Sequence, residues 1–97
     1  MRMLLHATMD TSMGNEAVRE GRVGDVVRRM TDRLRPEAVY FTSHAGRRSC
    51  YMVFDMQDSA QLPVISEPLF QELGAEIEIR PCMNIEDLQR GLGDLSG

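Results

Sequence analysis

The 97 residues of this chain are enough for one compact domain, so residues 1–97 are treated as a single unit. Hydrophobic residues make up 42% and charged residues 27% of the chain, which is ordinary for a globular protein in water. The formal net charge of −4 argues against a nucleic-acid partner, because phosphate binding needs a concentrated basic surface.

The opening segment and the cysteines favour a cytoplasmic location. Residues 1–7 become polar too soon to form a signal peptide or a membrane span, so no membrane contact is expected. The two cysteines, Cys50 and Cys82, lie far apart in the sequence and cannot build a disulfide framework. A reducing compartment is therefore expected.

A short apolar run over residues 3–9 predicts the first strand. It ends at residues 10–12, whose polar side chains favour a turn and a helix cap. The alternation of a strand divides this run between two faces. Met3, Leu5, Ala7 and Met9 belong to one face, and Leu4, His6 and Thr8 to the other.

The next segment has helical periodicity. A short helical turn is expected over residues 15–20, followed by a break near Gly21 and a main helix that runs to about Arg35. Pro36 ends this helix, because a proline disfavours the helical conformation in the residue before it.

Two runs rich in aromatic and β-branched residues predict a β-hairpin over residues 38–43 and 49–55. The intervening residues include Gly46, which is expected to take the positive-φ position of the turn. A second helix follows. Asp58 or Ser59 can cap it, Pro63 fits its first turn, and Pro68 is expected to end or restart it.

Strict alternation over residues 75–80 predicts the last strand, with Ile77 and Ile79 facing inward and Gly74 ending the preceding helix. A short amphipathic turn over residues 85–92 completes the chain. The order β-α-β-β-α-β predicts an α+β, ferredoxin-like fold. Right-handed crossovers place both helices on one face of a four-stranded antiparallel sheet of strand order 4-1-3-2.

The middle strands carry apolar residues on both faces. Val39 and Phe41 alternate with Tyr40, while Cys50, Met52 and Phe54 alternate with Tyr51 and Val53. An antiparallel sheet with one wet face should instead alternate apolar with polar residues. A second copy of the chain is the expected cover, in a twofold homodimer. Alternatively, the excess apolar residues lie under the C-terminal segment.

Several short motifs resemble known sequences. Residues 51–55, residues 67–70 and Ile77-Glu78-Ile79 resemble the second half of muconolactone isomerase, a member of the dimeric α+β barrel superfamily. Further motifs look like a family of small uncharacterised bacterial proteins in that superfamily: Gly14-Asn15, Arg35 before Pro36-Glu37-Ala38, Tyr40-Phe41, Glu67-Pro68-Leu69-Phe70 and Pro81-Cys82-Met83-Asn84.

This resemblance implies a homodimer with a cleft between each sheet and its helices or its partner. It implies no single reaction, because the relatives include isomerases, cofactor-independent monooxygenases, haem-degrading enzymes and ligand binders. The isomerase ends its last strand with a basic, histidine-containing segment, whereas this chain has Arg80-Pro81-Cys82.

The candidate site lies on the sheet face that the helices leave open. The last strand should pair with the first, which brings Glu78 and Arg80 toward His6. A carboxylate can hold the tautomer of an imidazole that moves protons near neutral pH, and an arginine can bind a carboxylate or enolate. Candidate ligand-binding residues on the same face are Thr8, Tyr40, Thr42 and Tyr51.

The expected function is binding of a small anionic or enolisable organic molecule in this sheet-side cleft. The alternatives are a cofactor-independent isomerase or monooxygenase and a purely structural, non-catalytic dimer in which Glu78 and Arg80 form an ordinary ion pair. No cofactor or metal is expected. His44 is expected to be exposed in the hairpin turn, Cys50 to pack as a small apolar residue, and Cys82 to be more exposed.

Overall fold

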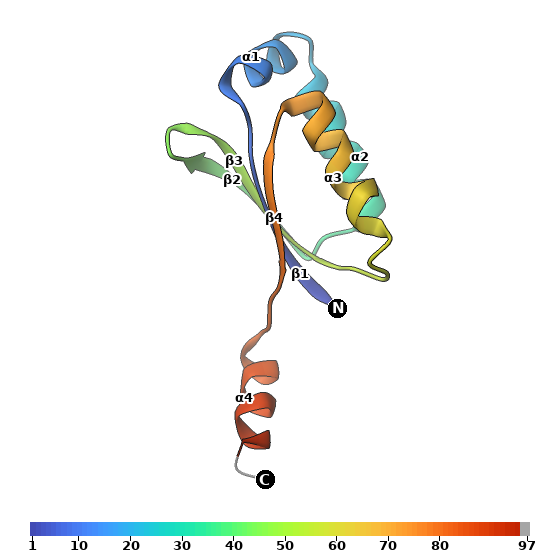
Figure 1. Ribbon diagram of the computed structural model, residues 1–97, viewed down its shortest axis with the longest axis vertical. Coiled ribbons are helices and arrows are strands. Elements are labelled where there is room, and N and C mark those ends of the chain that lie inside the picture. The colour runs from blue at the N-terminus through green and yellow to red at the C-terminus, as the bar shows by residue number, and fades with distance from the viewer. Residues whose placement is uncertain (96–97) are drawn as a thin grey trace.

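The computed structural model describes residues 1–95 (Figure 1). Four strands and four helices follow one another along the chain. They are β1 (Arg2–Thr8), α1 (Thr11–Arg19), α2 (Arg22–Leu34), β2 (Ala38–His44), β3 (Arg47–Asp55), α3 (Gln61–Leu73), β4 (Glu76–Pro81) and α4 (Ile85–Asp94).

The strands form one antiparallel sheet of order β2-β3-β1-β4, which is the predicted order read from the other edge. The first and last strands are each shifted by about one residue from their predicted bounds. Helices α1, α2 and α3 pack together on one face of this sheet (Figure 1). The fold is therefore the expected ferredoxin-like α+β arrangement.

The core lies between this face of the sheet and the helices. Its central side chains are Leu5 on β1, Phe54 on β3 and Val26 on α2, each almost completely buried. The predicted inward side chains of β4, Ile77 and Ile79, are half-buried against the same core. The alternation of β1 thus directs odd-numbered residues into the core and even-numbered residues to the opposite, open face.

The first helix begins earlier than predicted. Asp10 accepts a hydrogen bond from the backbone N–H of Met13 at 2.9 Å and caps α1, which therefore starts at Thr11 rather than near Asn15. Gly21 separates α1 from α2 as expected, with a φ of 73° that favours glycine. Helix α2 ends at Leu34, just before the predicted end.

The hairpin turn consists of Ala45 and Gly46, both at positive φ, at 52° and 76°. This pair of left-handed residues is the geometry of a two-residue hairpin loop, whose twist matches that of the flanking strands. The prediction for Gly46 is confirmed, and Ala45 shares the left-handed conformation.

The prediction that Pro68 ends or restarts the second helix is wrong. Helix α3 runs without a break from Gln61 to Leu73, with Pro68 inside it. Proline removes one backbone donor and crowds the preceding turn. Burial of Ile65, Leu69 and Leu73 along one side of the helix opposes that cost. Gly74 ends the helix in the left-handed conformation, as predicted.

Asp58 lies just before α3, and its carboxylate accepts the backbone N–H of Ala60 at 2.8 Å. The structure assigns the cap position itself to Ala60, which carries no side-chain cap. Asp58 therefore shapes the turn that leads into α3, and neither predicted residue caps the helix directly.

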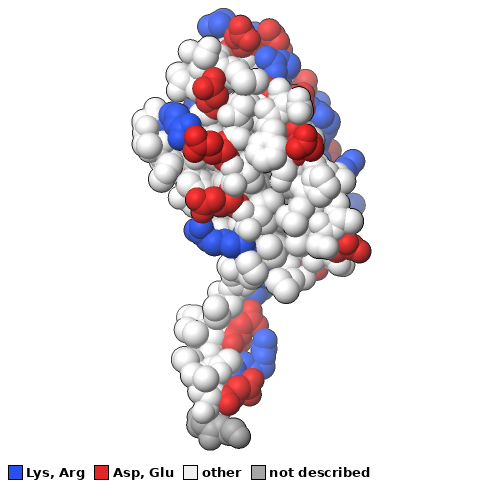
Figure 2. All heavy atoms as spheres, in the orientation of Figure 1, with Lys and Arg blue, Asp and Glu red and all other residues white. Residues whose placement is uncertain are grey.

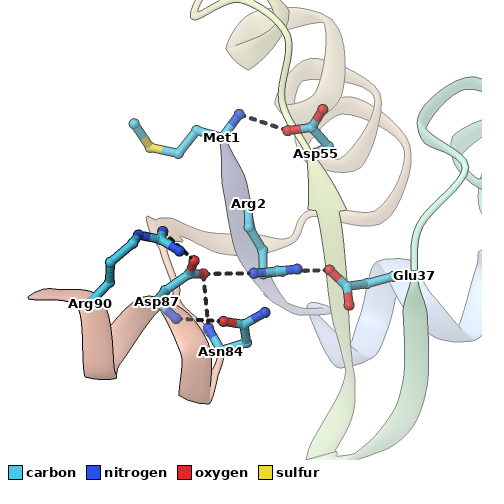
Figure 3. A network of polar contacts seen from close by, with 7 residues as sticks. All are labelled: Met1, Arg2, Glu37, Asp55, Asn84, Asp87 and Arg90. Atoms are coloured by element: carbon cyan, nitrogen blue, oxygen red, sulfur yellow. Dashed lines mark hydrogen bonds and ion pairs between the residues drawn. The ribbon is translucent and has the colours of Figure 1, made fainter.

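Helix α4 projects from the rest of the chain along the longest axis of the molecule (Figure 1). Asn84 and Asp87 form a reciprocal capping box at its start. Asp87 also accepts a bond from Arg2 at 2.9 Å, and Arg2 in turn contacts Glu37 (Figure 3).

Because α4 projects away from the sheet, the C-terminal segment does not cover the open face, which was the alternative to a second copy.

None of the helices in residues 1–95 has the length and apolar character needed to cross a membrane.

Candidate functional site

One row of side chains crosses the whole open face of the sheet. Antiparallel register places Tyr40 on β2 opposite Tyr51 on β3, Tyr51 opposite His6 on β1, and His6 opposite Glu78 on β4. Directly opposed residues share one face, so these four predicted site residues form a continuous line. The pairing of the first and last strands brings Glu78 beside His6, as the sequence predicts.

The rows on either side differ in chemistry. On the side nearer the hairpin turn the row is polar and contains Thr42, Ser49, Thr8 and Glu76. On the other side it contains Ala38, Val53, Leu4 and Arg80. The aromatic and histidine row therefore lies between a polar strip and a mostly apolar one that ends in an arginine.

Side chains of Tyr51, His44, Ser49 and Thr8 on this face hold His6 in position. Its ring stacks on Tyr51, with centroids 4.2 Å apart and planes 9° from parallel. The ring of His44 meets it edge-on, with a centroid distance of 4.9 Å. Its Nε2 atom lies 2.8 Å from the hydroxyl oxygen of Ser49. The imidazole is thus fixed in position before any ligand binds.

The Ser49 hydroxyl favours one tautomer of His6. Ser49 is buried, and its oxygen lies 3.0 Å from the backbone carbonyl oxygen of Ala7 and 2.8 Å from Nε2 of His6. When its one proton is donated to Ala7, Ser49 accepts a bond from His6, and Nε2 is then the protonated nitrogen of the neutral ring. This tautomer leaves Nδ1 with its lone pair, and among residues 1–95 Nδ1 has no hydrogen-bond partner.

The two carboxylates of β4 are engaged by arginines. Glu78 accepts a bond from Arg80 at 2.5 Å, and both side chains are more than half exposed. Arg47 on β3 reaches Glu76 at 3.3 Å. Glu78 therefore lies beside His6 in the register but bonds to Arg80, and the predicted carboxylate–imidazole contact is not formed in a single chain.

A shallow hollow of about 280 Å³ opens between these groups. It is lined by residues of β1, the end of β2 and β4: His6, Thr8, His44, Glu76, Ile77 and Glu78. The other predicted ligand-binding residues, Tyr40, Thr42 and Tyr51, lie on the same face beyond its edge. Its groups can donate, accept and carry protons, which suits a small polar molecule.

Comparison with known proteins places the chain in a family. The family model described as "Domain of unknown function (DUF3303)" matches residues 1–96. The chain belongs to this family. No curated protein matches it closely enough to count as a relative. The DUF3303 description assigns no reaction.

Two residues of this cluster were not among the predicted site residues. His44 was expected in the turn; it is exposed, as predicted, but it is the last residue of β2 and its ring reaches His6. Ser49 is the first predicted residue of the outgoing strand and carries no motif. His44 pairs with Arg47 across the two-residue turn, which fixes the register of β2 against β3. This register puts both His44 and Ser49 on the open face.

The two cysteines lie away from the His6 cluster. Cys50 is on the helix side of β3, and burial raises the pKa of its thiol. Cys82 is half-buried just after β4. Among residues 1–95, no three His, Cys, Asp or Glu side chains come together as metal ligands would.

Proposed function

We propose that this protein is a homodimer whose two open sheet faces meet and enclose a site for a small anionic, enolisable organic molecule. The observation that carries the proposal is the row of Tyr40, Tyr51, His6 and Glu78 across an uncovered sheet face. This row combines apolar area that needs a cover with an imidazole whose position is already fixed by its neighbours.

The uncovered apolar area supports a partner of the same kind. Tyr40 is 71% exposed, and Leu4, Tyr51 and Val53 are only half-buried on the open face. Fully burying one such side chain gains about 1.5–3 kcal/mol, while a domain has only about 5–15 kcal/mol of net stability. A twofold axis would bring this surface against its own copy, which covers both faces at once.

Helix α4 presents a second uncovered surface. Its large apolar side chains, Ile85, Leu88 and Leu92, are spaced three and four residues apart and are all exposed, as is Leu95 at its end. Figure 2 shows charged side chains along one side of α4 and uncharged atoms along the other. A helix of 10 residues with two internal glycines is marginal alone in water. A second copy would provide a cover for α4 as well.

The residues supply a route for proton transfer. Nδ1 of His6 would accept the proton from the carbon beside the carbonyl of the bound molecule, and the carbonyl would become an enolate. Arg80 lies in the next row, outside the hollow that His6 lines, and bonds to Glu78. It would exchange part of this contact for paired hydrogen bonds to the carboxylate or enolate oxygens of the bound molecule. Return of the proton from Nδ1 to a different carbon would complete an isomerisation without a cofactor.

Dimeric α+β barrel proteins, which several motifs of the chain resemble, include isomerases and cofactor-independent monooxygenases, and this resemblance favours the proposal. The second candidate is a non-catalytic dimer. The bond between Glu78 and Arg80 favours it, because both charges are already paired without a ligand. The two candidates share the dimer and differ in whether His6 moves a proton.

The test is proton exchange in heavy water. A panel of enolisable carboxylates, beginning with pyruvate, is incubated with the protein, and loss of the exchangeable proton is followed by NMR. The proposal predicts catalysed exchange that falls by about 10²–10⁴-fold in His6→Gln. Arg19→Gln is the control, because Arg19 is exposed at the end of α1 and does not line the hollow beside His6. Equal exchange rates for the wild type and His6→Gln would exclude proton transfer by His6 and favour the non-catalytic dimer.

A further inference from the structure

A second hollow lies on the other side of the sheet, away from His6. It has a volume of about 230 Å³ and extends between α2 and the strands β1, β2 and β3. Protein interiors are close-packed and hold few voids larger than a water molecule. An engineered apolar cavity of about 150 Å³ stays dry and binds benzene. This hollow therefore has room for one six-membered ring with a substituent.

Its walls are almost entirely apolar and rich in sulfur. Three of the eight methionines of the chain line it: Met9 after β1, Met30 on α2 and Met52 on β3. Cys50 lies in the same wall, and its raised pKa keeps its thiol neutral at physiological pH. Thioether sulfur makes favourable contacts with aromatic rings, and methionine adapts its shape to an occupant. The wall chemistry favours a flat, unsaturated ring.

One charged side chain lines the hollow. Arg48 lies on the helix-facing side of β3, next to Cys50 and opposite Ser43 of β2. Its guanidinium donates a bond to the neutral side-chain oxygen of Asn15 at 3.0 Å and packs against Gly14 of α1. Within residues 1–95 no carboxylate forms an ion pair with Arg48. Its positive charge therefore remains available at the rim of an apolar hollow.

We propose that this hollow binds a small aromatic carboxylate, with the ring between Met9, Met30 and Met52 and the carboxylate on Arg48. The site goes beyond the function proposed above, because the hollow lies on the opposite face of the sheet from His6 and His6 does not line it. Charge complementarity selects the anion, since an arginine binds a carboxylate through two parallel hydrogen bonds. Cavity size and sulfur contacts select the ring.

Benzoate is the probe for the test, and the methionine methyl groups are the reporters. The full-length protein carries ¹³C-methyl methionine and is titrated with benzoate. The proposal predicts saturable shifts of the methyl signals of Met9, Met30 and Met52. The other five methionines do not line the hollow, so their methyl signals should move little. They are Met1, Met3, Met13, Met56 and Met83. Benzyl alcohol, which keeps the ring but lacks the charge, should bind about tenfold more weakly.

Two variants separate the charge from the cavity. Arg48→Gln should weaken benzoate binding by about tenfold and leave benzyl alcohol unaffected. Arg19→Gln is its matched control, because Arg19 is exposed at the end of α1 and does not line the hollow. Val27→Phe, at a half-buried lining position on α2, should fill the space and abolish binding of both probes.

Three results would overturn the inference. The first is a titration in which these three methyl signals do not shift saturably in the folded wild type. The second is equal affinity of benzoate for Arg48→Gln and the wild type, which would remove the anion site. The third is unchanged binding to a folded Val27→Phe, which would place the ligand elsewhere.

Discussion

His6 and Tyr51 lie directly opposite each other on β1 and β3, with their rings 4.2 Å apart and nearly parallel. The stack lies in the middle of the open face, between Tyr40 and Glu78 in the same row. It turns a flexible histidine into a fixed group, and it also adds to the apolar area of that face. The position of the candidate site and the need for a partner thus depend on the same pair.

Replacing Tyr51 tests the stack. Tyr51→Leu should lower the free energy of unfolding by about 1 kcal/mol relative to Tyr51→Phe, because only phenylalanine keeps a ring opposite His6. Urea unfolding of both variants over the same series of protein concentrations gives the difference, because the dependence on concentration separates any change in association from the loss of the stack. Equal midpoints for Leu and Phe would show that the stack contributes nothing measurable.

Ser49→Ala tests the assignment of the His6 tautomer. The variant removes the acceptor of the Nε2 proton and the hydroxyl that bonds to Ala7. We expect a loss of about 1 kcal/mol in the free energy of unfolding and a change in the ¹⁵N signals of the His6 ring. Ser43→Ala, at an exposed position on β2, is the control. Unchanged ring signals in Ser49→Ala would contradict the hydrogen-bond assignment.

The start of α4 should respond to acid. The cap bond with Asn84, followed by the contacts with Arg90 and Arg2, lowers the pKa of Asp87 below its ordinary value of 3.8. The folded state therefore favours the charged carboxylate, so this stabilisation is present above pH 3.8 and is lost as the pH falls through the lower folded pKa.

Backbone NMR shifts of residues 85–94 measure this effect. At neutral pH, Asp87→Ala should reduce the helical content of α4, and at strongly acidic pH the variant and the wild type should converge. Asp94→Ala, at the far end of α4, should show no such loss. A wild type and an Asp87→Ala with the same helical content at neutral pH would exclude a role for the capping box.

The cysteines should differ in reactivity. Burial raises the pKa of Cys50, so little of its reactive thiolate forms near neutral pH. We expect a disulfide reagent to modify Cys82 first and Cys50 much more slowly, with the Cys50 rate rising as the pH is made alkaline. Cys82→Ser and Cys50→Ser identify the two phases. A faster Cys50 phase at neutral pH would contradict the burial of its thiol.

Much of the fold follows from local patterns in the sequence. Alternation in the strands, the break at Gly21 and the turn at Gly46 give the element order and the strand order. One error arises where packing outweighs local preference, because buried neighbours on both sides of Pro68 hold it inside α3. The other is a local signal placed too late in the sequence, since Asp10 caps α1 and starts it at Thr11.

The part of the candidate site that depends only on strand register was predictable from the sequence. Pairing of β1 with β4 and β3 places His6, Tyr51 and Glu78 in one row, which the fold alone requires. Side-chain bonding does not follow from register. Glu78 bonds to Arg80 rather than His6, and Ser49 and His44 become neighbours of His6 only through rotamers that the sequence does not specify.

Sedimentation velocity at micromolar concentration tests whether a second copy covers the open face. The expected wild-type species has a mass of about twice 11.0 kDa. Val53→Glu, which puts a charge on the open face, should shift the protein to the single-chain mass, whereas Val64→Glu on the exposed side of α3 should not. A wild type that sediments as a single 11.0 kDa chain at this concentration would show that no second copy covers the open face.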